Sequence, residues 1–158
     1  NKVKLKLLKF ITYSVKRLKE KKLMSTIQNC KIVFIPKIVD PRGNLSVIEN
    51  DVIPFKIKRV YYLYDVPSGA ERGGHSHKEQ QEFLVALSGS FDVILNDGNQ
   101  QKTVTLNKPF EGLLITNGIW RELKNFSSGA VCLVIASNVF EEEDYIREFK
   151  EFLESKSY

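Results

Sequence analysis

The chain has 158 residues, a length that suits one domain with a single core and is too short for two of ordinary size. Its formal net charge of +5 is unevenly spread, because residues 1–24 hold nine Lys or Arg and one Glu, a net charge of +8. Residues 25–158 therefore hold fifteen basic and eighteen acidic residues, or −3, which gives no indication of nucleic-acid binding by the domain.

Residues 1–24 are expected to form a basic tail, separate from a domain at residues 25–158. The tail has no apolar run longer than two residues, so it resembles neither a membrane span nor a cleavable signal peptide. Five apolar residues would share one face of a helix: Leu7, Leu8, Ile11, Val15 and Leu18. One reading is thus a basic amphipathic helix that touches acidic lipid. We favour the other, in which Met24, the only methionine, is the natural start and the residues before it pack against nothing.

From residue 31 onward the pattern is a series of short apolar segments separated by Gly and Pro. Strands are predicted at residues 32–39, 44–49, 57–65, 82–87, 90–95, 103–106, 113–116, 121–126 and 131–136, with the segment that carries the two histidines, His75 and His77, between the third and fourth. The Asp97-Gly98 step is a strong hairpin signal, because such turns need positive φ. This spacing predicts an all-β sandwich or barrel, not alternating strands and helices.

The period changes at the end of the chain. Between Glu141 and Leu153, the apolar residues recur at helical spacing, and acidic residues crowd the first turn, where they favour the helix dipole. We predict one C-terminal amphipathic helix over the outside of the β fold.

Two cysteines, Cys30 and Cys132, lie far apart and lack the spacing of a metal site. Cys132 stands in an apolar run and is expected to be a small buried hydrophobe. A reducing, cytoplasmic location is the simplest expectation.

The only two histidines, His75 and His77, are separated by one residue, so on a strand both rings would face one pocket. A metal site is one possibility, with Glu82 as a third ligand. However, the returning strand offers Arg121 where a further ligand is usually supplied, and a guanidinium repels a metal ion. The alternative is proton transfer by the imidazoles, with Arg59, Arg72 and Arg121 binding an anion or stabilising charge on a substrate oxygen.

The spacing Gly69-x5-His75-x-His77-x4-Glu82-x6-Gly89 resembles the first motif of the cupin superfamily, which implies a small RmlC-like jelly roll. Further segments are similar to the sugar-nucleotide 3,4-ketoisomerases, the FdtA or WxcM-like family: residues 40–45, 53–62, 72–78, 112–113, 120–122 and 144–147. The similarity runs from about residue 31 to about residue 153.

This resemblance implies a homodimer with exchanged N-terminal strands and no metal or other cofactor. Its substrate would be dTDP-4-oxo-6-deoxyglucose, whose ketone moves from C4 to C3 on the way to a 3-amino-3,6-dideoxyhexose for surface polysaccharide. His77 would be the main acid/base between C3 and C4, and His75 would assist with proton exchange at oxygen. Arg59, Arg72 and Tyr61 would hold the nucleotide and its pyrophosphate.

Two positions leave alternatives open. Arg121 stands where many relatives carry His, so the C4 configuration of the product is undetermined. Trp120 could stack on the thymine or the sugar, or belong to the core. Two other functions are also considered: a 3,5-epimerase acting on a dTDP-4-ketosugar, and a cupin that binds a sugar nucleotide without turnover.

Overall fold

The computed structural model describes residues 25–156. Its twelve strands are β1 (Lys31–Phe34), β2 (Lys37–Ile38), β3 (Leu45–Ser46), β4 (Arg59–Leu63), β5 (Arg72–His77), β6 (Glu82–Ser88), β7 (Phe91–Asn96), β8 (Gln101–Leu106), β9 (Glu111–Ile115), β10 (Trp120–Lys124), β11 (Val131–Ala136) and β12 (Tyr145–Ile146). The helical elements are η1 (Ile27–Asn29), η2 (Asn50–Val52), η3 (Glu142–Asp144) and α2 (Phe149–Lys156).

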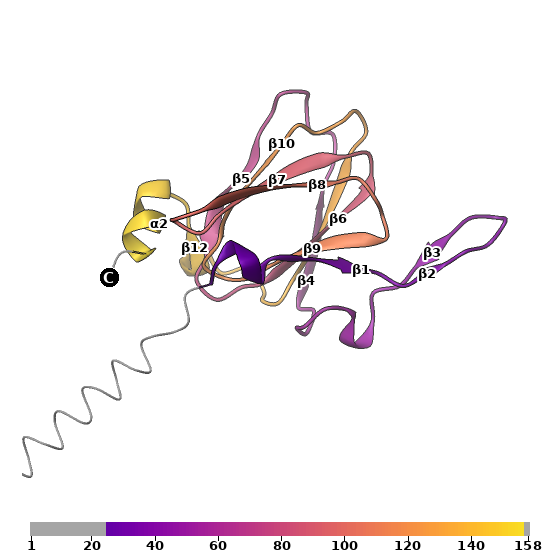
Figure 1. Cartoon of the computed structure of the whole chain (residues 1–158), viewed down its shortest axis with the longest axis horizontal. Coiled ribbons are helices and arrows are strands. Elements are labelled where there is room, and N and C mark those ends of the chain that lie inside the picture. Colours follow the sequence, from indigo (N-terminus) through magenta and orange to yellow (C-terminus); the bar gives the residue numbers. More distant parts are fainter. Residues whose placement is uncertain (1–24, 157–158) are drawn as a thin grey trace, which may run out of the picture.

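Two five-stranded sheets enclose the core (Figure 1). One has the order β1-β9-β6-β11-β4 and the other β12-β5-β10-β7-β8, while β2 and β3 form a separate pair. Strand β7 shows how alternate side chains of a strand face the core. Phe91, Val93 and Leu95 are buried, while the residues between them are partly exposed. The predicted all-β double-sheet fold with one C-terminal helix is confirmed.

The predicted turn at Asp97-Gly98 joins β7 to β8, and Gly98 has the positive φ of 92° that such a turn favours. The Asp97 carboxylate also accepts hydrogen bonds from the backbone N–H groups of Ile27, Asn99 and Gln100 at 3.0, 3.0 and 2.7 Å. One side chain therefore stabilises the turn and attaches η1 to it.

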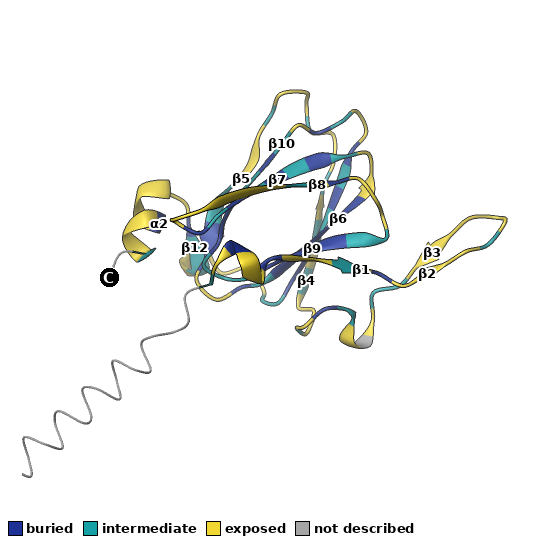
Figure 2. Ribbon diagram, viewed as in Figure 1, coloured by how far each residue is buried: buried dark blue, intermediate teal, exposed yellow. Residues whose placement is uncertain are grey.

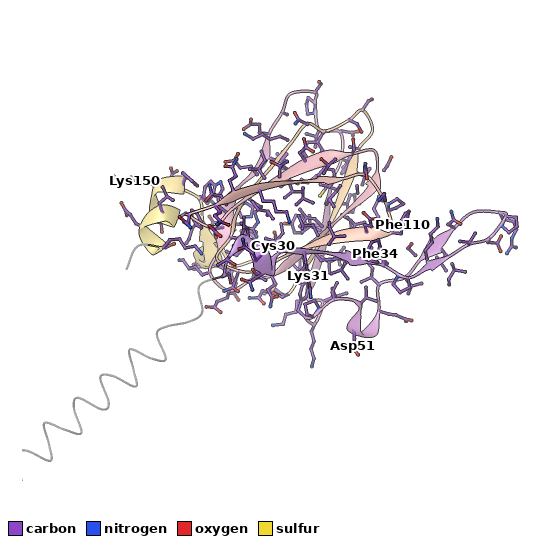
Figure 3. All side chains as sticks on the ribbon, in the orientation of Figure 1. Cys30, Lys31, Phe34, Asp51, Phe110 and Lys150 are labelled. Atoms are coloured by element: carbon purple, nitrogen blue, oxygen red, sulfur yellow. The ribbon has the colours of Figure 1, made fainter. Side chains whose placement is uncertain are left out.

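The first predicted strand is interrupted, since residues 32–39 divide into β1 and β2 around Ile35 and Pro36. Residues 35–55 then cover part of the outer face of the first sheet, where Ile35 and Ile53 pack in one cluster with Phe83. The β2–β3 hairpin projects away from the barrel and is exposed along both strands (Figures 1 and 2). Figure 3 shows Phe34 and Phe110 at the end of the barrel from which the hairpin extends.

The predicted helix from Glu141 to Leu153 is wrong at its start. Residues 142–144 form a 3₁₀ turn and residues 145–146 form β12, which pairs with β5, so that α2 begins only at Phe149. Tyr145 and Ile146 lie opposite His77 and Ser76 in this pairing. Local periodicity favoured a helix, but the open edge of β5 provides backbone hydrogen bonds that an extended segment can take up.

The predictions for residues 1–24, including the tail helix and the start at Met24, lie outside the described residues. Within residues 25–156, no helix is long and apolar enough to cross a membrane. Cys30 and Cys132 are both free and buried, as expected for Cys132.

Candidate active site

A cavity of about 650 Å³ is lined by residues from both sheets. Arg59 and Tyr61 reach it from β4, Glu82 from β6, and Arg72 and His75 from β5, while Arg121 lies on β10. The second sheet therefore supplies the histidine, and the first supplies a carboxylate facing it. Further lining residues include Phe140, Tyr145 and Arg147.

The two histidine rings lie on the same face of β5, as the alternation of a strand requires. Their centroids are 4.9 Å apart and the rings meet edge to face at 84°. His75 lines the cavity, whereas His77 is fully buried and is not part of the lining. The structure thus brings the rings together but gives only His75 direct access to the cavity.

The His75 ring is held in its neutral form. Burial, with help from the nearby Arg121 cation, lowers its pKa to about 3. Among the described residues, its Nε2 atom is buried without a hydrogen-bond partner. A neutral ring with an unpaired nitrogen at a cavity wall can accept a proton from a bound ligand or donate one to it.

The His77 ring has partners at both nitrogens. Its Nδ1 lies 2.9 Å from Oδ2 of Asp144, and its Nε2 lies 3.0 Å from the Gln80 amide nitrogen and 3.3 Å from Oε1 of Glu82. Burial lowers the pKa of His77, and Arg121 lowers it further, while Glu82 and Asp144 act in the opposite direction.

Glu82 is the centre of the buried polar network. Its Oε1 accepts hydrogen bonds from the Tyr61 hydroxyl and the Gln80 amide, both at 2.9 Å, and its Oε2 pairs with Arg121 at 2.8 Å. Burial alone would raise the pKa of Glu82, but the Arg121 guanidinium and the two histidine rings together hold that pKa well below its usual range. Burial and the Glu82 charge together raise the pKa of Tyr61, which keeps its hydroxyl protonated.

His75, His77 and Glu82 place potential metal-ligating atoms within 4.8 Å of one another. However, the Glu82 carboxylate is already paired with a buried guanidinium and accepts two other hydrogen bonds. A divalent cation would have to displace Arg121 or lie beside its charge. The donor set therefore fits proton transfer better than metal binding.

The cavity suits an anionic ligand. The arginines Arg59, Arg72 and Arg147 line it together with Arg121. Arg59 donates to the Tyr145 hydroxyl at 3.1 Å and stacks over the Tyr61 ring at 4.9 Å. Several arginines can bind the oxygens of a phosphate group through paired hydrogen bonds.

The predicted helix from Glu141 to Leu153 gave no sign that three of its residues belong to the site. They are Asp144, Tyr145 and Arg147. The Tyr145 ring contacts both histidine rings, with centroids 4.9 Å from His75 and 4.3 Å from His77. Residues 144–147 belong to a segment that the family resemblance had marked, and this was the signal that could have placed them at the site.

Trp120 does not line the cavity. It is 5% exposed and packs with Ile146 and Phe152, while its indole N–H donates to Glu122 at 3.0 Å. The geometry supports the core alternative for this ring and removes it from the residues that can stack on a ligand.

Comparisons with known proteins give a family-model match and several similar chains. The FdtA family model, described as WxcM-like, C-terminal, matches residues 28–157. The TDP-4-oxo-6-deoxy-alpha-D-glucose-3,4-oxoisomerase of Aneurinibacillus thermoaerophilus is 46% identical over 123 residues, which are 77% of this chain and 88% of that protein. The solved WlaRB TDP-quinovose 3,4-ketoisomerase of Campylobacter jejuni is 47% identical, covers 81% of this chain and 99% of its own, and has a TM-score of 0.77.

The structure of QdtA, a sugar 3,4-ketoisomerase of Thermoanaerobacterium thermosaccharolyticum in complex with TDP, is 38% identical with a TM-score of 0.80. The match covers 83% of this chain and 96% of that one. A dTDP-4-dehydrorhamnose 3,5-epimerase from Bacillus anthracis has a TM-score of 0.68 at 14% identity, over 77% of this chain and 79% of its own, and shares the fold alone.

Proposed function

Because this chain belongs to the FdtA family of WxcM-like proteins, we propose that it is a sugar-nucleotide 3,4-ketoisomerase that converts dTDP-4-oxo-6-deoxyglucose to the 3-oxo sugar. The observation that carries this function is the neutral His75 ring, with an unpaired nitrogen, in a cavity lined by arginines and backed by His77. The product would be a precursor of a 3-amino-3,6-dideoxyhexose.

The reaction moves two hydrogens and changes no overall oxidation state. A base removes the proton at C3, and the electron pair of the C–H bond forms a C3=C4 double bond with negative charge on the C4 oxygen. The C3 hydroxyl then loses its proton, the C4 oxygen gains one, and C4 is reprotonated, which leaves the ketone at C3. Arginine side chains facing the developing oxyanion would lower this barrier by several kcal/mol.

We assign His77 the proton transfer between C3 and C4, because it has a carboxylate near each ring nitrogen and so can be stabilised when it takes a proton. His75, whose ring lines the cavity and whose buried Nε2 is unpaired, is assigned the protons at oxygen. The sugar must then approach His77 more closely than the cavity reaches in this structure.

The nucleotide is assigned to the part of the cavity that Arg59 and Arg72 line. Arg59 and Arg72 have the charge to bind the pyrophosphate, and the Tyr61 ring lies under the Arg59 guanidinium. Arg121 lies between Glu82 and the backbone carbonyl of His75, to which it donates at 3.1 Å. From this position it can influence which face of C4 receives the proton.

A homodimer is proposed from the surface of the domain. The β2–β3 hairpin exposes Ile38 and Leu45, and its neighbour Phe34 is 71% exposed. Strand β4 is the edge of its sheet and exposes Val60 and Tyr62. Exchange of N-terminal strands between two copies would bury these groups, and sedimentation velocity tests the dimer.

We also propose that the domain comprises residues 25–158 and works in the cytoplasm. Buried free cysteines, Cys30 and Cys132, are compatible with a reducing compartment. Fractionation of cells that produce the protein without a fusion tag would test the location.

The decisive experiment is incubation with dTDP-4-oxo-6-deoxyglucose in heavy water, followed by NMR. We expect a 3-oxo product with no deuterium at C5, and couplings at C4 give its configuration. Exchange at C5 would identify an epimerase, and binding without any product would identify a non-catalytic protein. His77→Asn should lose about 10²- to 10⁴-fold in kcat and keep its fold by circular dichroism.

A further inference from the structure

We propose that Asp144 is a positioning residue that fixes His77 in the tautomer with the proton on Nδ1, so that Nε2 is the basic nitrogen. The inference rests on the proposed acid/base role of His77 and adds a residue that acts only through that ring. Asp144 itself does not line the cavity.

The first argument is the geometry of the carboxylate. Oδ2 of Asp144 lies 2.9 Å from Nδ1 of His77, and Oδ1 accepts from the backbone N–H of Glu79 at 2.7 Å. The backbone carbonyl of Asp144 also accepts from Lys78 at 2.9 Å. An ionised carboxylate can only accept hydrogen bonds, so the Nδ1 atom that faces it must carry the proton.

The Gln80 amide gives an independent second argument at the opposite side of the ring. Its nitrogen lies 3.0 Å from Nε2 of His77 and 2.9 Å from Oε1 of Glu82. An amide nitrogen has two hydrogens, so one can be donated to each partner. This arrangement requires Nε2 of the neutral His77 ring to be an acceptor, which is the same tautomer that Asp144 selects.

The charges around His77 explain how it could hold a transferred proton. Asp144 from η3 and Glu82 from β6 are the anionic groups that face it, Arg121 from β10 is the cation, and the rings of His75 and Tyr145 pack against it. A proton added at Nε2 could be donated to Glu82, 3.3 Å away, while Asp144 continues to accept from Nδ1. Removing the Asp144 charge should therefore lower the pKa of His77 and weaken it as a base.

The test compares Asp144→Asn with Glu143→Gln, which makes the same charge change at the neighbouring exposed residue. Asp144→Asn should reduce kcat about 10- to 100-fold with little change in KM, and shift the acidic limb of the rate profile to lower pH. Glu143→Gln should match the parent in both measurements. Parent-like kcat and pH dependence in a folded Asp144→Asn protein would overturn the proposal.

A second measurement does not depend on activity. The chain has only two histidines, so a ¹⁵N-histidine spectrum contains two rings, and His75→Asn assigns them. We expect the parent His77 to show a proton on Nδ1 and a bare Nε2, and a proton on Nε2 would refute the proposal. If His77→Asn retains activity while the tautomer is as expected, the acid/base assignment fails and the positioning by Asp144 stands.

Discussion

Replacing Glu82 by Gln should strongly destabilise the protein, because it removes the only carboxylate bonded to a buried guanidinium in the described part of the chain. Arg121 is 1% exposed, and its Nη2 pairs with Glu82 at 2.8 Å. Gln has the same shape but lacks the charge, and its NH₂ group would face donors that now bond to the carboxylate, from Tyr61, Gln80 or Arg121.

The size of the effect follows from the burial of both partners. Breaking a buried pair by removing one member costs about 3–5 kcal/mol, because the other charge is left uncompensated. Folded domains have unfolding free energies of about 5–15 kcal/mol in total, so this is a large share. With a urea dependence of about 2 kcal/mol per molar, the unfolding midpoint should fall by about 2 M.

Urea unfolding can be followed by the fluorescence of Trp120, the only tryptophan and a buried one. Glu111→Gln is the matched control, since it removes a carboxylate that pairs with the exposed Lys108, and it should change stability by less than about 1 kcal/mol. The double variant Glu82→Leu/Arg121→Met, which removes both charges, should be more stable than Glu82→Gln alone.

The effect should also depend on pH. The folded-state pKa of Glu82 is depressed, so its stabilisation is present above the unfolded value of about 4.3 and is lost as pH falls toward the folded value. The difference between the parent and Glu82→Gln should therefore be largest near neutrality and shrink below about pH 4. A difference under about 1 kcal/mol at pH 7, or one that grows in acid, would refute this account of the ion pair.

Two further substitutions test the packing and the turn. A Cβ added at Gly112 would clash with the ring of the fully buried Phe83. Gly112→Ala should therefore lower the free energy of unfolding, measured in urea, by at least about 1–3 kcal/mol. Adding Phe83→Leu to the Gly112→Ala protein should recover part of that loss. Asp97→Ala should lower the thermal midpoint by removing the acceptor for three backbone N–H groups, with a cost of about 1–3 kcal/mol for the buried Ile27 donor and less for the exposed Asn99 and Gln100 donors, which water can satisfy. Asp97→Asn keeps one acceptor oxygen and should lose less, and equal losses in the two variants would contradict this role.

Most strands could be predicted from the sequence because their information is local. Alternation in β7, the Asp97-Gly98 turn and the Gly and Pro residues between segments each act over a few positions. The spacing of His75 and His77 likewise determined that their rings share a face of β5, since side chains repeat every two residues on a strand. The family motif added the double-sheet topology that periodicity alone could not give.

Contacts between distant residues were decided by the tertiary structure. Asp144 and His77 are 67 residues apart in the sequence, and Arg121 and Glu82 are 39 apart. No local sequence pattern can predict a contact over such separations. The same reason explains the late start of the final helix: Tyr145 and Ile146 fit a helical period, but the free edge of β5 pairs with them as a strand. The sequence by itself determined which chemical groups this protein has and which neighbours share a face, because these depend on covalent spacing. The fold decided which ring reaches the cavity and which carboxylates support it, because burial and long-range pairing exist only once the sheets have come together.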